Sequence, residues 1–240
     1  MKFQTKITKV ENGQEIIYGQ NLEKLMEENT FGQNIFFLLT GKLPNKKESK
    51  IFEVILSSVI DHGPATASAL NARISASAKN PLHTSVAAGL LGLGDRHGVV
   101  ISQAMDFFYS HIEEKNILEL LTKMKKEKKY VLGFGHKFFT DADPRTLKLF
   151  SLAKEYGLFG KHCKLALAIE KNLNDISSKK LPLNADGAIA AILCDMGFAS
   201  NIGNGIFVIA RVPGLVAQIL EEVESGVGIR RLEESEIEYL

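Results

Sequence analysis

The 240-residue sequence has few cysteines, no tryptophan and almost no net charge. Its two cysteines, Cys163 and Cys194, lie in apolar stretches, which excludes a disulfide framework and suits a reducing cytosol. The formal net charge of +1 provides no overall field to hold a nucleic acid or a membrane surface. We therefore expect neither among the partners, and we expect a cytoplasmic location.

Long apolar runs are also missing. The most apolar run, residues 205–220, is shorter than the about 20 residues that a bilayer span needs, and it contains Arg211 and Pro213. The first 14 residues are polar and lack the apolar core of a secretory signal. We expect a buried helix at 205–220 and no membrane-spanning segment.

Helical periodicity, in contrast, is present along most of the sequence. Thr30 and Gln33 have the spacing of a capping box ahead of an apolar run, and Asn21 can cap a short helix before it. Asp143 followed by Pro144 predicts the start of a helix that ends near Tyr156. The other predicted helices cover residues 51–60, 65–78, 84–93, 98–109, 112–128, 161–172, 187–196 and 205–224. With no alternation of strands and helices, the sequence predicts a mostly α-helical fold after a hairpin-like start at 3–18.

Four predicted junctions between a loop and a helix combine an ionisable residue with glycine or proline. They are Asp61–Pro64, Gly94–Gly98, Gly133–His136 and Leu183–Gly187. Three of the six histidines, His62, His97 and His136, lie in them. The positive end of a helix dipole favours neutral imidazole, which can donate a hydrogen bond to a developing oxyanion. Each histidine–glycine pair alone, however, is more typical of a structural cap than of a catalyst.

Other kinds of site find less support. The sequence has no HxH, HExxH or CxxC spacing, so we expect no metal site. Gly92–Gly94 lacks the preceding strand and the spacing of a dinucleotide-binding loop. The lysines within 123–129 indicate either a solvated helix end or a landing site for the phosphates of a nucleotide-like cofactor. Arg211 needs an acidic partner, either a structural carboxylate or a bound ligand.

In this order, the junctions resemble the citrate synthase superfamily. The similar segments are 133–136 with 143–145 (its GFGH…DPR signature), 183–186 (its PNVD loop), 61–62 (its DHE segment), 95–98 (its PLHG loop) and 31–44 (its FEEVAYLLLYGELP helix and turn). The similarity therefore spans nearly the whole chain, and five ordered motifs are far more specific than any one.

Within the superfamily, the chain most resembles the citryl-CoA lyase branch, the module at the end of ATP-citrate lyase. The segments most similar to that branch are 61–65, 94–96, 183–187 and 204–208. Pro44 and Asp61 are only 17 positions apart, where synthases have long helices, and Gly63 replaces a glutamate that is typical of synthases. His97 departs in the other direction, because synthases carry a histidine there, and it keeps synthase chemistry open.

The resemblance implies specific roles at the site. His136 would polarise the carbonyl of oxaloacetate or the corresponding hydroxyl of citryl-CoA, and His97 would hydrogen-bond the enol oxygen of acetyl-CoA. Asp186 would exchange the carbon-bound proton. The three carboxylates would be held by His62, Arg145, Arg211 and Arg231, the last supplied by a partner subunit. Coenzyme A, as part of the substrate and not as a tightly bound cofactor, would bind at Val131, Leu132, Gly133, Phe134 and Gly135.

These roles imply an all-α enzyme that cleaves citryl-CoA to acetyl-CoA and oxaloacetate. A large domain would comprise residues 1–97 and 197–240, and a smaller domain residues 98–196. The two domains would close over the substrate, and the family implies a homodimer or a higher homo-oligomer. Two alternatives stay open: a citrate or 2-methylcitrate synthase, and a non-catalytic helical binding protein of the same fold.

Overall fold

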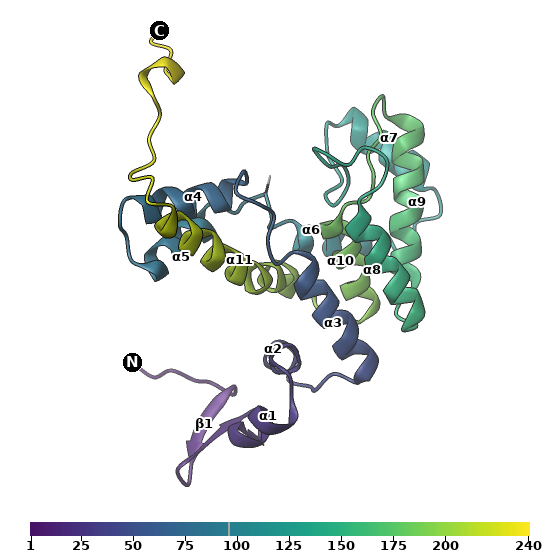
Figure 1. The fold of residues 1–240 in the computed structure, drawn as a ribbon. Helices are drawn as coiled ribbons and strands as arrows, with labels where there is room; N and C mark the ends of the chain where they lie inside the picture. Colours follow the sequence, from purple (N-terminus) through teal and green to yellow (C-terminus); the bar gives the residue numbers. More distant parts are fainter. Residues whose placement is uncertain (96) are drawn as a thin grey trace.

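The computed structural model describes residues 1–95 and 97–240, and this part of the chain is mostly helical, as predicted (Figure 1). Its helices are α1 (Leu22–Glu28), α2 (Phe31–Thr40), α3 (Lys46–Ser58), α4 (Ala67–Ser77), α5 (Leu82–Leu91), α6 (Ile101–Ser110), α7 (Ile117–Lys126), α8 (Pro144–Glu155), α9 (Lys161–Ile176), α10 (Ala185–Asp195) and α11 (Gly203–Ser225). Two 3₁₀ turns, η1 (Ser200–Ile202) and η2 (Glu234–Glu236), complete the helical elements of these residues. Arg96, in the predicted junction 94–98, lies outside the described residues.

The N-terminus forms the predicted hairpin. Strands β1 (Thr8–Glu11) and β2 (Gln14–Ile17) pair antiparallel, and β3 (Gln20–Asn21) adds to the other side of β2. Asn12 and Gly13 form the two-residue turn with φ values of 51° and 77°, the backbone that an Asn-Gly pair favours.

The capping residues named from the sequence begin their helices. The Asn21 side chain accepts a hydrogen bond from Lys24 N, and the capping box of Thr30 and Gln33 is formed in both directions. Asp143 accepts from Arg145 N, and Pro144 is the first residue of α8.

Several predicted helix boundaries are wrong: the helices predicted to start at 51 and 98 begin at Lys46 and Ile101, and two others have a clear local cause. The helix predicted at 112–128 begins only at Ile117, because the Asn116 side chain caps it by accepting from Glu119 N at 3.2 Å. The helix predicted at 161–172 continues to Ile176, because Leu173 and Ile176 extend its apolar face onto the core.

The core is organised around α10. Ala188 to Leu193 are all fully buried, and α6, α8 and α9 pack around them. In Figure 1, α10 accordingly lies within the group formed by α6, α8 and α9. A helix made of small and aliphatic residues on every side can be enclosed in this way, since no face needs water.

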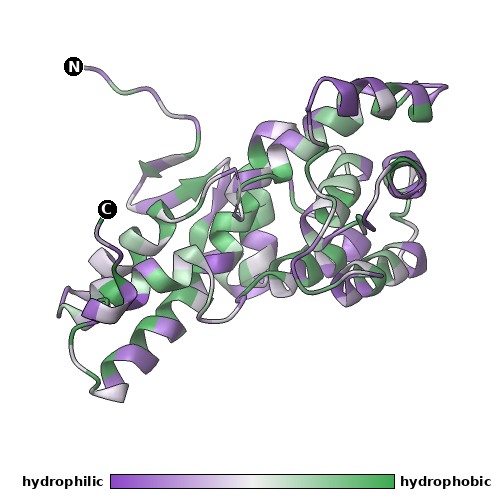
Figure 2. Cartoon of the chain, turned by 90° about the horizontal axis from the view of Figure 1, so that it is seen from above, coloured by the Kyte–Doolittle hydropathy of each residue, from purple (hydrophilic) through white to green (hydrophobic). Residues whose placement is uncertain are grey.

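A second group is formed by α4, α5 and α11. Ala72, Ala76, Leu215 and Ile219 make its core, and Figure 1 shows the three helices side by side. In Figure 2, hydrophobic residues gather on the helix sides that face one another. No helix in the described residues combines the length and hydropathy needed to cross a bilayer.

Candidate active site

Two adjoining cavities bring together all of the predicted site residues except Arg231. The smaller, the polar cavity, has a volume of about 140 Å³ and is lined by Val59, His62, His97, Gly98, His136, Arg145, Asn184, Ala185, Asp186, Phe207 and Arg211. The larger, the CoA-loop cavity, has a volume of about 560 Å³ and includes all five residues of the predicted loop 131–135. His97, Gly98, Asn184 and Asp186 line both cavities. The two residues predicted to act on the acetyl group therefore lie where the cavities meet.

Asp143 orients Arg145 from beneath the polar cavity. Its fully buried carboxylate accepts from Arg145 Nη2 at 2.8 Å and Nε at 3.1 Å, and also from the backbone N–H groups of Arg145 and Ala185. Burial alone would raise the pKa of Asp143, but the Arg145 guanidinium and the backbone donors outweigh it and lower the pKa. From the sequence, Asp143 was identified as a helix cap and as part of the DPR signature, but its contacts with Arg145 and α10 were not predicted.

His136 presents a donor to the cavity. Its Nδ1 lies 3.1 Å from Phe138 N and 3.2 Å from Phe139 N, and an N–H can only donate, so Nδ1 is the acceptor. In the neutral ring the proton is then on Nε2, which lies 3.4 Å from Arg145 Nη2. His136 Nε2–H and Arg145 Nη2–H are both donors, and no acceptor lies between them. A ligand oxygen at this position could accept a hydrogen bond from each.

His62 lies on the other side of the same guanidinium. Its Nδ1 is 3.4 Å from Arg145 Nη1, and its ring meets that of His136 edge-on at 5.9 Å between centroids. Burial, followed by the charges of Arg145 and Arg211, lowers the pKa of His62. Burial also lowers the pKa of His136, with Asp143 opposing and Arg145 adding to the shift. The prediction that His136 stands at a helix start is wrong: α8 begins eight positions later, and burial and arginine charge favour the neutral ring instead.

The loop that carries His62 lies directly against α11. A Cβ on Gly214 would lie 2.2 Å from the carbonyl oxygen of Ile60 and 3.0 Å from the Cα of Asp61. Gly214 therefore allows this close approach, and it lies one helical turn after Arg211. His62 and Arg211 reach the same cavity from segments almost 150 positions apart in the sequence.

Arg211 is buried without an ion pair. Its Nε donates to the Val59 carbonyl at 2.8 Å, and its guanidinium carbon lies 4.8 Å from the centroid of the Phe207 ring. Within the described part of the chain, no carboxylate lies within 4.0 Å of it. Burial lowers its pKa, while Asp61 and Asp186 oppose that shift from farther away. Of the two partners considered above, this geometry favours a bound acidic ligand.

His97 is fixed by Ser68, which was not among the predicted site residues. Ser68, fully buried in α4, places its Oγ 2.9 Å from His97 Nε2. The backbone of His97 also exchanges two hydrogen bonds with Gly94, of 2.8 Å and 2.9 Å. Burial, followed by the charge of Arg211, lowers the pKa of His97. The imidazole is therefore held neutral, as the predicted role requires.

Asp186 lies in the first turn of α10. Asn184 caps that helix by accepting from Gly187 N at 3.1 Å, and its Nδ2 donates to the Gly135 carbonyl at 3.0 Å. Burial raises the pKa of Asp186 to about 6, with Arg145 and Arg211 opposing the rise. Asp186 is thus mostly ionised at neutral pH, yet more basic than an exposed carboxylate.

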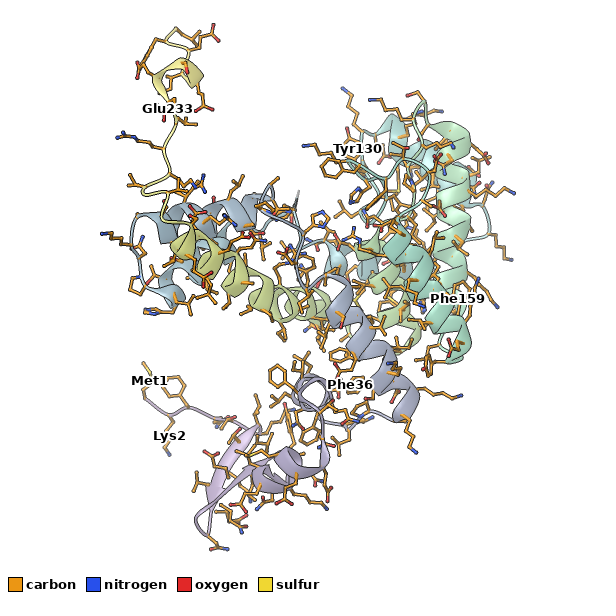
Figure 3. The ribbon with its side chains drawn as sticks, in the orientation of Figure 1. Met1, Lys2, Phe36, Tyr130, Phe159 and Glu233 are labelled. Atoms are coloured by element: carbon orange, nitrogen blue, oxygen red, sulfur yellow. The ribbon has the colours of Figure 1, made fainter. Side chains whose placement is uncertain are left out.

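The CoA-loop cavity combines an apolar wall with positive charge. Leu121, Met124, Leu173, Ile176 and Leu181 form the wall, and Lys125, Lys128 and Lys129 also line the cavity. Lys125 Nζ donates to the Ile176 carbonyl, and Lys129 pairs with Glu127 at 2.7 Å. Lys126 lies elsewhere, in a shallow hollow on α7. Tyr130 also lines the cavity, and Figure 3 marks its position.

One predicted residue is not brought to the site. Arg231 belongs to the exposed segment after α11 and lines neither cavity. The described residues contain no group of three or more histidine, cysteine or acidic side chains that could hold a metal ion.

Comparison with known proteins identifies the family. Residues 44–232 match the family model described as citrate synthase, C-terminal domain. The solved citryl-CoA lyase of Hydrogenobacter thermophilus is 39% identical, with a TM-score of 0.93, and the match covers 99% of this chain and 94% of that one. The ATP citrate lyase of Methanothrix soehngenii, solved with citrate and coenzyme A, is 26% identical with a TM-score of 0.88, and the match covers 100% of this chain and 42% of that one.

Curated relatives agree with these structures. The ATP-citrate synthase of Mus musculus is 32% identical over 253 residues, which cover 96% of this chain and 23% of the mouse protein. The chain thus spans about a quarter of the length of that relative. The predicted family and the resemblance to citryl-CoA lyases are both confirmed, and the chain belongs to the citrate synthase family.

Proposed function

We propose that this protein is a citryl-CoA lyase, an enzyme that cleaves citryl-CoA to acetyl-CoA and oxaloacetate. One observation carries the proposal: His97 and Asp186 lie at the junction between an arginine- and histidine-lined cavity and a cavity formed by the 131–135 loop. A citryl thioester has a carboxylate-rich end and a nucleotide end, and its reacting carbons lie between them.

The polar cavity suits the carboxylate-rich end. Arg145 and Arg211 supply planar guanidinium groups, and neutral His62 supplies hydrogen-bonding nitrogen beside them. A ligand oxygen between His136 Nε2 and Arg145 Nη2 would satisfy both donors. We assign that position to the C3 oxygen of citryl-CoA, which becomes the carbonyl of oxaloacetate.

Cleavage follows from these positions. The C3 hydroxyl releases its proton to solvent water, a carbonyl forms, and the bond between C3 and the acetyl carbon breaks with its electron pair moving onto the thioester as an enolate. His97 stabilises the enolate oxygen. The fraction of Asp186 that holds its proton, which the raised pKa of about 6 keeps available at neutral pH, gives that proton to the carbon and completes the methyl group. Asp186 regains a proton from solvent, which balances the proton lost by the hydroxyl. Placing charge stabilisers on both oxygens lowers the energy of the transition state rather than that of the substrate.

The same site could run in the opposite direction. Synthases carry a histidine at the position of His97, as noted above, and the 2-methylcitrate synthase of Shewanella oneidensis is 29% identical over 85% of this chain. A synthase would also hydrolyse the thioester that condensation forms.

Product analysis separates the possibilities. Supplied with citryl-CoA, the protein should release acetyl-CoA and oxaloacetate in equal amounts, and His136→Ala should release neither. Citrate with free CoA thiol would instead identify a synthase. The absence of turnover would favour a non-catalytic binding protein of the same fold.

We also propose that the active unit is a homodimer in which Arg231 enters the neighbour's polar cavity. The support is that Arg231 is exposed and lines neither cavity of its own subunit. Arg231→Ala and His136→Ala subunits, mixed under conditions of exchange, should recover part of the activity. If they recover none, the assignment in trans is wrong.

The division into domains 1–97 with 197–240 and 98–196 is part of the same proposal. The polar cavity is lined from both ranges, so movement of one against the other would open or close it. The cytoplasmic location stays a prediction from the cysteine content.

A further inference from the structure

The end of α11 carries a buried carboxylate that neither cavity uses. Glu222 is only 4% exposed, and it lies one turn before the helix ends at Ser225. A carboxylate buried to this extent needs charged or polar partners, because an isolated buried charge is strongly destabilising. Glu222 has two such partners, and they come from different parts of the chain.

Two arginines share this carboxylate. Arg73 of α4 donates from Nε to Oε2 at 2.7 Å. Arg230, in the C-terminal tail (residues 226–240), donates from Nε to Oε1 at 2.6 Å and from Nη2 to Oε2 at 3.1 Å. The backbone N–H of Arg230 also donates to Ser77 Oγ, at the end of α4, at 2.9 Å. The tail is therefore fixed at Arg230 to both helices.

Glycines lead the chain into this anchor. Gly226 and Gly228 have φ values of 63° and 85°, a backbone region that other residues rarely adopt. Beyond the anchor the tail runs away from the helical body, and Figure 3 marks Glu233 on its far part (Figures 1 and 3). Leu232 and Tyr239 of this part are 67% and 75% exposed, as expected of a segment that packs on a second copy of the chain.

We propose that Glu222 is a positioning residue, which fixes Arg230 so that the next residue, Arg231, is directed toward the polar cavity of the neighbouring subunit. This inference rests on the proposed role of Arg231 in trans. Arg231 follows the anchored residue immediately, so its backbone begins from a defined point. Ordering the tail beforehand lowers the entropy that would otherwise be lost when Arg231 binds a substrate carboxylate.

Two variants test the anchor from its two sides. Arg230→Ala removes the tail's half of the ion pair and leaves the pair of Arg73 and Glu222 intact. Glu222→Gln keeps the shape and removes the charge. Each should raise the KM for citryl-CoA about fivefold or more, with a smaller change in kcat, since the loss falls on substrate binding.

The same changes made in an Arg231→Ala background decide whether positioning is the cause. When the residue being positioned is absent, Arg230→Ala and Glu222→Gln should have no further effect on KM, because coupled residues are not additive. Glu221→Gln is the matched control: Glu221 is an exposed partner of Arg73 and does not contact Arg230, so its loss should leave the kinetics unchanged.

The outcomes are distinguishable. If Arg231→Ala alone leaves KM unchanged, the role of Arg231 in trans is wrong, and the positioning role of Glu222 is wrong with it. If Arg231→Ala raises KM but the two anchor variants raise it equally with and without Arg231, then Glu222 only stabilises the fold. The proposed function of the site would survive that second result.

Discussion

The backbones of Gly133 and Gly187 are in direct contact. A Cβ added to Gly187 would lie 2.4 Å from the carbonyl oxygen of Gly133, and one added to Gly133 would lie 2.7 Å from the Cα of Gly187. Gly133 belongs to the loop of the CoA-loop cavity, and Gly187 follows Asp186 in the first turn of α10. The distance between the loop and Asp186, the proposed proton donor, is therefore fixed by two residues without side chains.

Gly187→Ala should disrupt this contact. The added methyl group cannot be accommodated without moving either the loop or α10, and small displacements of reacting groups have large kinetic effects. We expect kcat/KM for citryl-CoA to fall by about tenfold or more. Gly205→Ala, at an exposed helical position with open space around it, should leave activity unchanged. Wild-type kinetics in Gly187→Ala would contradict the account of this contact.

Asp143→Ala should weaken both the fold and the site. The substitution removes the cap of α8 and leaves Arg145 without its carboxylate, so the free energy of unfolding should fall by about 2–4 kcal/mol. Because the pKa of Asp143 is lowered in the fold, its contribution is fully present above the unfolded-state pKa and is lost progressively as the pH falls from that value through the lower folded-state pKa. Urea unfolding at pH 7 and at pH 3 measures this difference.

A matched control is Asp141→Ala. Asp141 lies two positions before Asp143 in the same loop, and its exposed carboxylate pairs with Lys180. It should have little effect at either pH. Two results would contradict the structural role of Asp143. One is a loss of unfolding free energy in Asp143→Ala that is no larger than the loss in Asp141→Ala, and the other is a loss as large at pH 3 as at pH 7.

Lysine substitutions should distinguish a binding site from a solvated helix end. Lys128 lines the CoA-loop cavity, whereas Lys126, two positions earlier, does not. Lys128→Gln should raise the KM for citryl-CoA severalfold at low salt and less at high salt, because mobile ions screen exposed charges. Lys126→Gln should have little effect. Equal effects of the two substitutions would indicate that the lysines within 123–129 form only a solvated helix end.

The parts of this fold that depend on neighbouring residues could be predicted from the sequence. Asn21, Thr30 and Asp143 begin their helices as expected, because a capping side chain acts on backbone groups within three positions of it. Gly133–His136 and Leu183–Gly187 were noticed as glycine-containing junctions, and the resemblance to the citrate synthase superfamily then implied the roles of the 131–135 loop and Asp186. Their positions side by side in one cavity come from the fold.

The contacts that orient the site residues join positions far apart in the sequence. No pattern among neighbouring residues predicts them. Ser68 meets His97 across 29 positions, and Arg145 meets His62 across 83. In the sequence, Ser68 is one small residue in a predicted alanine-rich helix, and its neighbours do not indicate a contact with His97. The neutral state of His136 was expected for the wrong reason, since burial and the Arg145 charge become visible only once the chain is folded.

Asp186→Asn should make the protein more stable at pH 8. With its pKa raised to about 6, folded Asp186 holds its proton to higher pH than in the unfolded chain, so ionisation above that pH opposes folding. Removing the charge should raise the free energy of unfolding by up to about 3 kcal/mol at pH 8, and the gain should shrink toward pH 4. Urea unfolding at both values measures it. A variant that is less stable at pH 8 would refute the raised pKa.

The most direct test of the account is proton transfer to carbon by Asp186. Citryl-CoA is supplied in deuterated water, and the methyl group of the released acetyl-CoA is analysed for deuterium, together with the rate of cleavage. Wild-type protein should place one deuteron in each methyl group, and Asp186→Asn should cleave about 10²–10⁴ times more slowly while still binding substrate. If Asp186→Asn cleaves citryl-CoA within about tenfold of the wild-type rate, Asp186 is not the proton donor and the proposed mechanism is wrong.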